Sequence, residues 1–214
     1  MKNKKLILAI DTSTHFLSIA LYKDGQIFCS TKNSLDHSEN LVKILDKILS
    51  LSEVRLKDIN LLAVNIGPGS FTGLRIGLCF VKFLAKYFRL KIVTTNSFWM
   101  LLYEFIKKYD LNKNCKIVAL FPSVKNEFYF CEFEVNNKKE QKMMKYGYVK
   151  QSEMNFKNVD FFLIPKFVKI DIKNSVKLSF SAKQIIQMFL DESSLYKIVS
   201  YYQLVPFYVR HTYY

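Results

Sequence analysis

The sequence predicts an α/β fold in which helices cover a β-sheet, and two observations support this prediction. Short, continuous apolar runs that are typical of buried strands alternate with segments whose apolar residues recur at helical spacing. Half of the 214 residues are hydrophobic, which is enough to bury a sizeable core and excludes a chain that is disordered throughout. A chain of this length forms one large domain or two small ones.

The first half of the chain supplies most of this pattern. Asp24-Gly25 between two apolar runs predicts a hairpin, and a capping box at residues 36–39 predicts the start of a helix. A glycine-rich turn at residues 67–73 separates a buried strand from a long helix. In chain order we expect strands at residues 6–10, 16–22 and 27–31, a helix at 41–51, a strand at 61–66, a helix from the turn to 88, a strand at 92–95 and a helix at 98–107.

The second half is less regular, and no internal repeat is visible in the sequence. We expect strands at residues 115–121, 127–135 and 159–164, a loop in the polar stretch 136–145, a short helix at 181–190 and an aromatic tail at 201–214. A change of pattern near residues 96–98 predicts a domain boundary. This gives one lobe over residues 1–97 and a second over 98–214, and it leaves open whether the tail packs back on the first lobe.

The chain is strongly basic, with 32 Lys and Arg against 18 Asp and Glu and a net charge of +14. A nucleic-acid partner and a generally lysine-rich composition both explain this charge, and both stay open. The four cysteines form no CxxC pair, so we expect reduced thiols. The apolar run at residues 6–10 ends too early for a signal peptide, and no apolar stretch reaches membrane-spanning length. We therefore expect a cytoplasmic protein without a membrane partner.

Two segments have the residue types that hold a phosphate. Asp11, Thr12 and Ser13 close the first strand and combine a carboxylate and hydroxyls with tight-turn amides. Gly67 and Gly69 lie in the turn before the long helix, where unpaired N–H groups attract anions. The turn is neither a Walker loop nor a GxGxxG fingerprint. An ordinary polar turn and a tight helix entry are the alternatives.

The helix after the glycine turn has more apolar surface than one sheet can cover. Gly73 and Gly77 lie four residues apart on it, which permits another backbone to approach closely. The helix at residues 41–51 has a similarly broad apolar face. The two helices predict a helix-on-helix interface with a partner, and the alternative is that the second domain covers them. The cations of the long helix form a single stripe, made of Arg75, Lys82, Lys86 and Arg89.

No catalytic apparatus is visible in the sequence. The expected fourth strand carries Asn65, where a metal-dependent nuclease of similar strand order needs a carboxylate. We find no HxxxH or HExxH motif and no Ser-His-Asp or Cys-His arrangement. The sequence therefore predicts no catalytic residue and no metal site.

Three motifs resemble one known family. They are LAIDTST at residues 8–14, His37-Ser38-Glu39, and GPGSFTGLRIG at residues 67–77. These segments resemble the TsaB family, also called YeaZ, the bacterial partner subunit in the synthesis of tRNA threonylcarbamoyladenosine (t6A). The resemblance is specific over residues 6–97 and weak beyond them, apart from residues 127–129 and 206–210.

The resemblance implies an actin-like ATPase fold, which is ribonuclease H-like, with two related lobes of which the second is shortened. It also implies a non-catalytic scaffold subunit that dimerises with the threonylcarbamoyltransferase TsaD, is joined by the ATPase TsaE, and reaches tRNA through that complex. In the family the partners meet through helices that correspond to residues 38–51 and 72–88. The expected interface residues are Leu41, Ile44, Leu45, Ile48, Phe71, Thr72, Gly73, Leu74, Arg75, Gly77, Leu78 and Val81.

The chain departs from these relatives at two places. The catalytic relative has a metal-binding histidine pair where this chain has TNSFWM at residues 95–100, and this loss argues for a non-catalytic subunit. Pro122-Ser123-Val124 stands where the family usually has Asp-Ala-Arg. We therefore expect no cofactor on the isolated chain, and ATP or ADP only at the interface of the complex. The residues of the vestigial nucleotide site are Asp11, Thr12, Ser13, Gly67 and Gly69.

Two alternatives stay open, and a third is disfavoured. A small actin-fold ATPase or phosphotransferase that acts on its own would use Asp11 and the glycine turn on a nucleotide phosphate. An isolated chain would bury the same two helices in a homodimer. A peptidase is disfavoured, because the sequence has neither a nucleophile–base pair nor a metal set.

Overall fold

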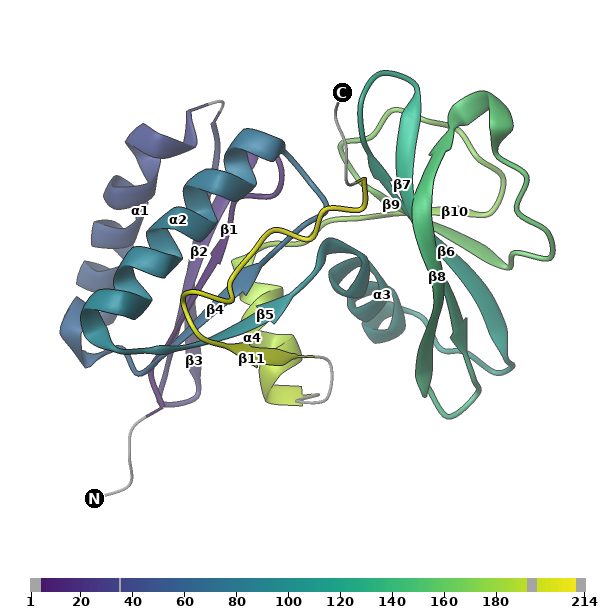
Figure 1. The fold of residues 1–214 in the computed structure, drawn as a ribbon. Coiled ribbons are helices and arrows are strands. Elements are labelled where there is room, and N and C mark those ends of the chain that lie inside the picture. The colour runs from purple at the N-terminus through teal and green to yellow at the C-terminus, as the bar shows by residue number, and fades with distance from the viewer. Residues whose placement is uncertain (1–4, 35, 192–195, 211–214) are drawn as a thin grey trace. The chain divides into compact units, whose positions relative to one another are not determined.

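The computed structural model describes residues 5–34, 36–191 and 196–210, which form two compact units (Figure 1). The first unit comprises Met1–Asn96 and Ser181–Phe207, and the second comprises Ser97–Phe180 and Tyr208–Tyr214. The first division falls at the boundary expected near residues 96–98. Residues 181–207 differ from the expectation, because they return to the first unit and do not continue a lobe over 98–214. Of the aromatic tail, residues 211–214 lie outside the described residues.

The first unit is built on a mixed sheet. Within the described residues its strand order is β11-β5-β4-β1-β2-β3. Neighbours among β1, β4 and β5 are parallel, and the β1–β2, β2–β3 and β5–β11 pairs are antiparallel. The strands are β1 (Ile7–Asp11), β2 (Phe16–Lys23), β3 (Gln26–Asn33), β4 (Leu61–Asn65), β5 (Lys91–Thr95) and β11 (Lys197–Val199).

Helices cover both faces of this sheet (Figure 1). Helices α1 (His37–Ser52) and α2 (Phe71–Phe88) pack in one core with Leu8, Ile10 and Ile19. Helix α4 (Ala182–Asp191) packs on the opposite face, where its first N–H donates to Ser18 Oγ at 3.1 Å. Ser18 and Ile19 face opposite sides because successive residues of a strand alternate. A short 3₁₀ helix, η1 (Leu56–Asp58), leads into β4.

Both long helices begin at residues that satisfy their first N–H groups. Asp36 Oδ1 accepts from the N–H of Glu39 at 3.1 Å, as the capping box predicts. Ser70 Oγ accepts from the N–H of Gly73 at 3.1 Å. The caps place the N-termini of α1 and α2 at the same edge of the sheet, the carboxyl edge of β1 and β4.

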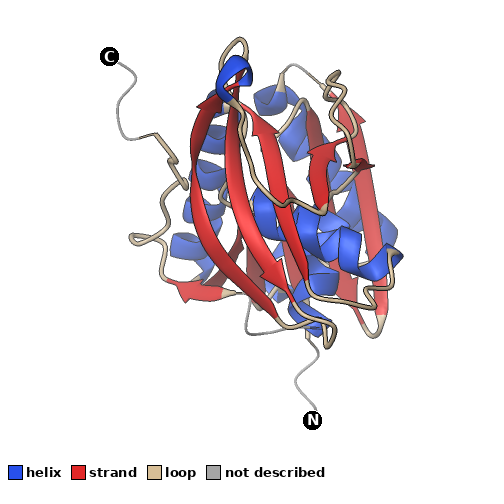
Figure 2. Ribbon diagram, turned by 90° about the vertical axis from the view of Figure 1, so that its right-hand side faces the viewer, coloured by secondary structure: helices blue, strands red, loops and turns tan. Residues whose placement is uncertain are grey.

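The second unit has a sheet with one helix against it. Helix α3 (Ser97–Lys108) contacts β6, β9 and β10, and the sheet faces the viewer in Figure 2. Within the described residues its strand order is β10-β9-β6-β7-β8. The strands are β6 (Cys115–Pro122), β7 (Glu127–Val135), β8 (Gln141–Lys150), β9 (Phe161–Pro165) and β10 (Ser175–Leu178), with a 3₁₀ helix η2 (Gln151–Glu153) after β8.

The two sheets repeat one topology, although no sequence repeat is visible. In each unit an antiparallel meander of three strands is extended by two parallel strands beside its first strand. In the first unit α1 and α2 form the connections to these parallel strands. The matching connections of the second unit, residues 151–160 and 166–174, are described in full and contain only η2 and loop. The second lobe is therefore shortened by two helices.

The prediction of a loop at residues 136–145 is wrong for residues 141–145. Residues 141–150 form β8, which pairs with β7 and lies at the edge of the sheet. An edge strand tolerates the lysines that made this stretch look like a loop, because one side of the strand stays in water. The short strands β10 and β11 were not expected either. Across the described residues, every helix is too short or too polar to cross a membrane.

Candidate functional site

The expected nucleotide site is a buried polar cluster at the carboxyl edge of β1 and β4. Asp11 Oδ1 accepts from the backbone N–H of Ser13 at 3.0 Å and from Nδ2 of Asn65 at 3.2 Å. The same amide donates to Ser13 Oγ at 3.0 Å, and Asn65 Oδ1 accepts from the N–H of Gly67 at 2.9 Å. Asn65 therefore links the Asp11–Ser13 segment to the glycine turn.

Burial dominates the electrostatics of this cluster. Asp11 is 2 % exposed, and desolvation raises the pKa of its carboxyl above the usual value. Hydrogen bonds from Ser13 and Asn65 act against this rise but do not cancel it. A carboxylate that takes part in phosphate or magnesium chemistry needs access to its ligand, whereas the oxygens of Asp11 are enclosed by their own chain.

The glycine turn closes directly onto the Asp11–Ser13 segment. A Cβ atom on Gly69 would overlap the backbone of Ser13, and the N–H of Ser70 donates to the carbonyl of Ser13 at 2.7 Å. One turn further on, a Cβ on Gly73 would overlap the carbonyl oxygen of Thr12, and one on Gly77 would overlap Thr12 Oγ1. The structure brings all five expected nucleotide-site residues together, and hydrogen bonds within the cluster hold Asp11, Ser13 and the N–H of Gly67. The close approach at Gly73 and Gly77 is therefore made by this chain's own Thr12, through its backbone at Gly73 and through its side chain at Gly77.

His37 joins helix α1 to the same cluster. Its Nε2 lies 2.7 Å from the carbonyl oxygen of Thr14, and because a carbonyl only accepts, Nε2 carries the proton. The ring is buried, and its Cδ2 would contact a Cβ placed on Gly73. The sequence marked this histidine only as part of a motif. Its role as a buried connection between α1 and the turn after β1 depends on tertiary contacts that no local pattern reveals.

An apolar groove runs between α1 and α2 on the surface of the first unit. It encloses about 600 Å³. From α1 it is lined by Leu41 and Val42, and from α2 by Cys79, Phe80 and Phe83. Phe83 is 60 % exposed and Val42 is 51 % exposed, although both are large apolar side chains. Exposed apolar side chains that gather along one groove are typical of a surface that a partner covers.

The exposed groove lies on a different side of each helix from most of the interface residues that the sequence predicted. Of the twelve expected interface residues, Phe71, Thr72 and Arg75 are exposed, and the guanidinium of Arg75 lies 3.7 Å from the centre of the Phe71 ring. The other nine are buried within the first unit; Gly73 and Gly77 approach Thr12 in the turn after β1, and Leu41 also lines the groove. These nine are Leu41, Ile44, Leu45, Ile48, Gly73, Leu74, Gly77, Leu78 and Val81.

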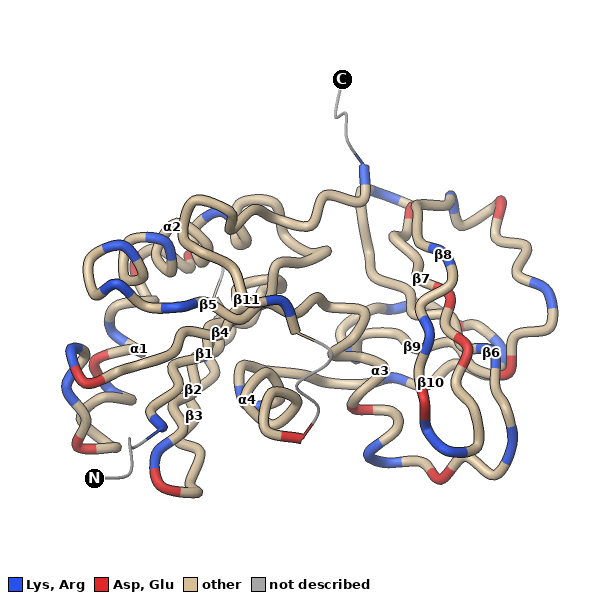
Figure 3. Tube along the Cα trace, turned by 60° about the horizontal axis from the view of Figure 1, so that its bottom comes forward, with Lys and Arg blue, Asp and Glu red and all other residues tan. Residues whose placement is uncertain are grey.

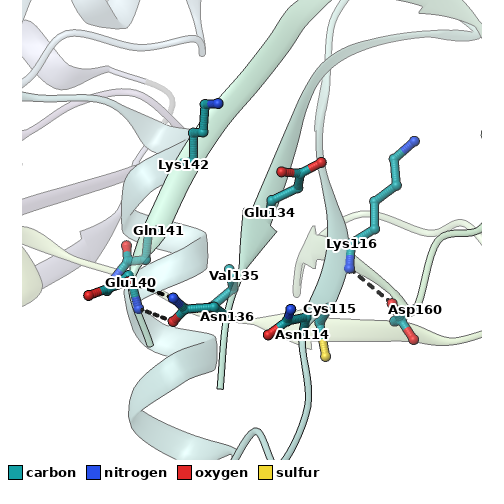
Figure 4. Close-up of a pocket in the computed structure, with 10 residues that line it drawn as sticks. All are labelled: Asn114, Cys115, Lys116, Glu134, Val135, Asn136, Glu140, Gln141, Lys142 and Asp160. Atoms are coloured by element: carbon teal, nitrogen blue, oxygen red, sulfur yellow. Dashed lines mark hydrogen bonds between the residues drawn. The ribbon is translucent and has the colours of Figure 1, made fainter. Parts of the chain in front are cut away.

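A second hollow, of about 600 Å³, lies at one end of β6, β7 and β8 in the second unit (Figure 4). Its polar groups already bond to one another: Asp160 Oδ2 accepts from the N–H of Lys116 at 2.9 Å, and Asn136 Oδ1 accepts from the N–H of Glu140 at 2.9 Å. Burial raises the pKa of the Cys115 thiol, which disfavours a reactive thiolate. We interpret this hollow as the space beneath a hairpin loop.

The two second-half segments that carried the resemblance meet in the second unit. Arg210 Nη2 donates to Glu127 Oε2 at 2.8 Å, and its guanidinium lies 4.1 Å from the centre of the Tyr148 ring. Both members of this ion pair are largely buried. The segment at Pro122-Ser123-Val124, where relatives usually have Asp-Ala-Arg, lies at the adjacent β6–β7 turn. Among the described residues, no three His, Cys, Asp or Glu side chains gather in a way that would hold a metal ion.

Comparison with known proteins shows which family has this architecture. The family model described as TsaD, tRNA N6-adenosine threonylcarbamoyltransferase, matches residues 30–194, which is more than half of the chain. TsaB of Buchnera aphidicola subsp. Schizaphis graminum is 27 % identical over 210 residues, covering 92 % of this chain and 99 % of that protein. TsaB of Escherichia coli K12 is 32 % identical over 129 residues, covering 60 % of this chain and 54 % of that protein.

Solved structures agree with this result. A Pseudomonas aeruginosa protein described as similar to the peptidase YEAZ superposes with a TM-score of 0.78 at 18 % identity, covering 96 % of this chain and all of its own. YeaZ from Pseudomonas aeruginosa superposes with a TM-score of 0.72 at 18 % identity, covering 95 % of this chain and 99 % of its own. The α/β fold of the actin-like, ribonuclease H-like kind is thereby confirmed. The chain belongs to the TsaD family and, within it, to the TsaB (YeaZ) group.

Proposed function

We propose that this chain is a non-catalytic scaffold subunit in t6A biosynthesis that dimerises with a TsaD-type threonylcarbamoyltransferase. Its relatives are named as t6A biosynthesis proteins or as that transferase, which supports the pathway. In this proposal the chain works in the cytoplasm, a TsaE-type ATPase joins the pair, and tRNA is bound through the complex. Its contribution is binding free energy that holds the catalytic subunit in a competent geometry.

The observation that carries the proposal is the groove between α1 and α2. Burying its apolar side chains in a partner stabilises the complex by about 25 cal/mol per Å² of apolar surface. Loss of free tumbling and ordering of side chains oppose association, so a cluster of large side chains contributes most of the net affinity. Phe83 and Val42 supply such a cluster from two adjacent helices.

The buried Asp11 cluster supports the non-catalytic part of the proposal. A phosphotransferase needs its carboxylate and its glycine-turn amides to contact the nucleotide phosphates. Here Asp11, Asn65 and Ser13 bond to one another at 3.0–3.2 Å. In our proposal ATP or ADP binds only at an interface that the partner completes. Titration of the isolated chain with ATP and magnesium tests this, and binding with turnover would favour the independent ATPase instead.

Co-purification of a TsaD-type subunit tests the interface. We expect Phe83→Asp to abolish co-purification, because it places an unpaired charge in an apolar contact. The matched control is Tyr146→Asp, which changes a side chain of similar exposure on β8 of the second unit. Loss of pairing in the control alone, or in neither variant, would contradict the assignment of the groove.

A homodimer of the isolated chain is the alternative occupant of the same groove. Light scattering on the purified chain reports its mass in solution. Phe83→Asp is expected to convert any such dimer to monomer, since the dimer would bury the same side chains. A dimer that survives this substitution would use another surface.

A further inference from the structure

The basic stripe on α2 leads to a second surface of the first unit, which the proposed pairing does not use. A hollow of about 390 Å³ lies between the C-terminal end of α2, the start of β5 and the segment after β11. Lys86, Arg89, Lys91 and Tyr201 line it together with apolar and backbone groups. We call these four residues the basic hollow. It differs in every lining residue from the α1–α2 groove.

The cations of the basic hollow have no acidic partner among the residues that the structure describes. Within the described residues, none of Lys86, Arg89 and Lys91 forms an ion pair with a carboxylate. All three are exposed, and Lys82 lies one helical turn before Lys86 on the same side of α2. Elsewhere cations pair with acids, for example Lys113 with Asp160 at 2.8 Å. Figure 3 shows basic segments along α2 and beside β5 and β11.

Helix α2 is capped at its C-terminal end by Arg89, in a backbone conformation that favours glycine. Arg89 has φ of 55°, a left-handed conformation that glycine adopts without steric cost, and helices that end in this conformation usually have glycine there. A cation near a helix C-terminus is favourable, which accounts for one positive charge. It does not account for Lys91 on β5 or for the tyrosines beyond β11.

Exposed tyrosines border these cations. Tyr201 lines the hollow, and Tyr202 is 71 % exposed and contacts Tyr201 edge-on with ring centres 5.6 Å apart. Cations bind phosphates of a nucleic-acid backbone, and exposed aromatic rings stack on bases that are not paired. Binding of single-stranded nucleic acid without sequence preference combines these two elements.

We propose that the basic hollow, with Lys82 and Tyr202 at its rim, is an RNA-binding surface that holds backbone phosphates and stacks an unpaired base. In this proposal two sides of helix α2 bind different partners. Phe80 and Phe83 face the partner groove, and Lys82, Lys86 and Arg89 face the RNA. The identity of the RNA as a tRNA rests on the proposed function, whereas the binding chemistry rests on the described residues alone.

The test is fluorescence anisotropy of the full-length chain with a labelled RNA hairpin that has the stem and loop of a tRNA anticodon arm. We expect Lys86→Gln, Arg89→Gln and Lys91→Gln combined to weaken binding about tenfold or more and to lower the salt slope by about 2, since each phosphate contact contributes roughly 0.7 to 0.9. Tyr202→Ala should weaken hairpin binding about fivefold or more. Tyr202→Phe should bind the hairpin as tightly as the wild type, because stacking needs only the ring.

The matched control combines Lys125→Gln, Lys138→Gln and Lys177→Gln. These exposed lysines of the second unit give the same change in net charge. Equal hairpin affinity of the two triple variants would overturn the proposal, as would a wild-type chain that leaves the hairpin unbound. Polyglutamate that binds as tightly as the hairpin and depends on the same residues would also overturn it, because the surface would then select acidic protein.

Co-purification of the TsaD-type subunit separates this inference from the proposed function. The Lys86, Arg89 and Lys91 triple variant is expected to pair normally, because its substitutions lie outside the groove. Normal pairing with unchanged RNA affinity defeats the RNA surface alone. Failure of the wild-type chain to pair defeats the proposed function, and the hairpin titration still decides the RNA surface.

Discussion

At the scale of single residues, the most informative feature is that Asp11 and Asn65 bond to each other. The residue types of the expected nucleotide site are present, but Asn65 donates to the carboxylate of Asp11 and accepts from the N–H of Gly67 in the glycine turn. Burial raises the pKa of Asp11 because the charged form loses its hydration. A conspicuous acidic motif therefore acts here as a structural connection.

Asp11→Asn tests this interpretation through pH dependence. The folded-state pKa of Asp11 lies above the unfolded value, so the unfolded chain loses its proton first and the contribution of Asp11 to stability falls as pH rises between the two values. Asparagine does not titrate. We expect the variant to gain stability relative to the wild type as pH rises from about 4 to about 8, measured by urea denaturation. A stability difference between variant and wild type that stays constant or moves the other way as pH rises would contradict a raised pKa of Asp11.

Gly77→Ala tests the close approach of α2 to the turn after β1. Alanine favours a helix by about 1 kcal/mol over glycine, but overpacking costs about 1–3 kcal/mol, so we expect net destabilisation. The obstacle at Gly77 is the side chain of Thr12, and Thr12→Ala should restore most of the loss.

Gly73→Ala is the matched control for that rescue. Its obstacle is the carbonyl oxygen of Thr12, which Thr12→Ala does not remove. Denaturation midpoints of the two single variants and the two double variants measure the difference. Equal rescue at both glycines would contradict the described packing.

At the scale of elements, α2 shows what periodicity predicts and where it stops. The spacing correctly indicates a helix with apolar residues on most sides and one basic stripe. It does not tell which apolar side faces the sheet. The nine buried residues assigned to a partner face the core, whereas Phe83 is exposed, because the sheet covers only one side of the helix.

Val81→Asp and Phe83→Asp separate the two sides of α2. Val81 is fully buried, so an aspartate there should cost about 3–5 kcal/mol and unfold a large fraction of the chain. Phe83→Asp should change the free energy of unfolding by about 1 kcal/mol or less, because the side chain is exposed. Circular dichroism during urea titration measures both. Similar stability of the two variants would contradict the orientation of the helix.

Strand β8 is an element that the local sequence pattern did not predict. Residues 141–150 contain three lysines and one glycine, a composition that favours a loop. They form a strand because β7 offers a complete hydrogen-bonding edge, with Cys131 opposite Tyr146 and Tyr129 opposite Tyr148. Pairing of this kind depends on a neighbour that a local window does not contain.

At the scale of the whole molecule, the two units have the same strand order, and each sheet packs against a helix that follows the other sheet's last parallel strand in the sequence. Helix α3 follows the last parallel strand of the first unit but packs on the second sheet, and α4 follows the last parallel strand of the second unit but packs on the first. Sequence order alone predicts two contiguous lobes, so this exchange could not be predicted. The apolar pattern predicted most strands and helices, because burial imposes it locally.

The C-terminal segment provides a prediction at the same scale. Arg210→Ala removes a largely buried ion pair with Glu127 and a contact with the Tyr148 ring. We expect a loss of about 1–3 kcal/mol in the free energy of unfolding. Arg55→Ala is the control, because its ion pair with Asp58 is exposed and should contribute nothing measurable. Equal effects in denaturant titrations would show that the segment is not held by Arg210.

The rate at which a TsaD-type subunit modifies tRNA decides whether the chain acts as a scaffold through the α1–α2 groove. The rate is measured for that subunit alone and with wild-type, Asp11→Asn or Phe83→Asp chain added. We expect the wild type and Asp11→Asn to raise the rate equally and Phe83→Asp to leave it at the level of the subunit alone. A chain that pairs but loses its effect through Asp11→Asn, while Phe83→Asp remains fully active, would contradict a scaffold that acts through the α1–α2 groove.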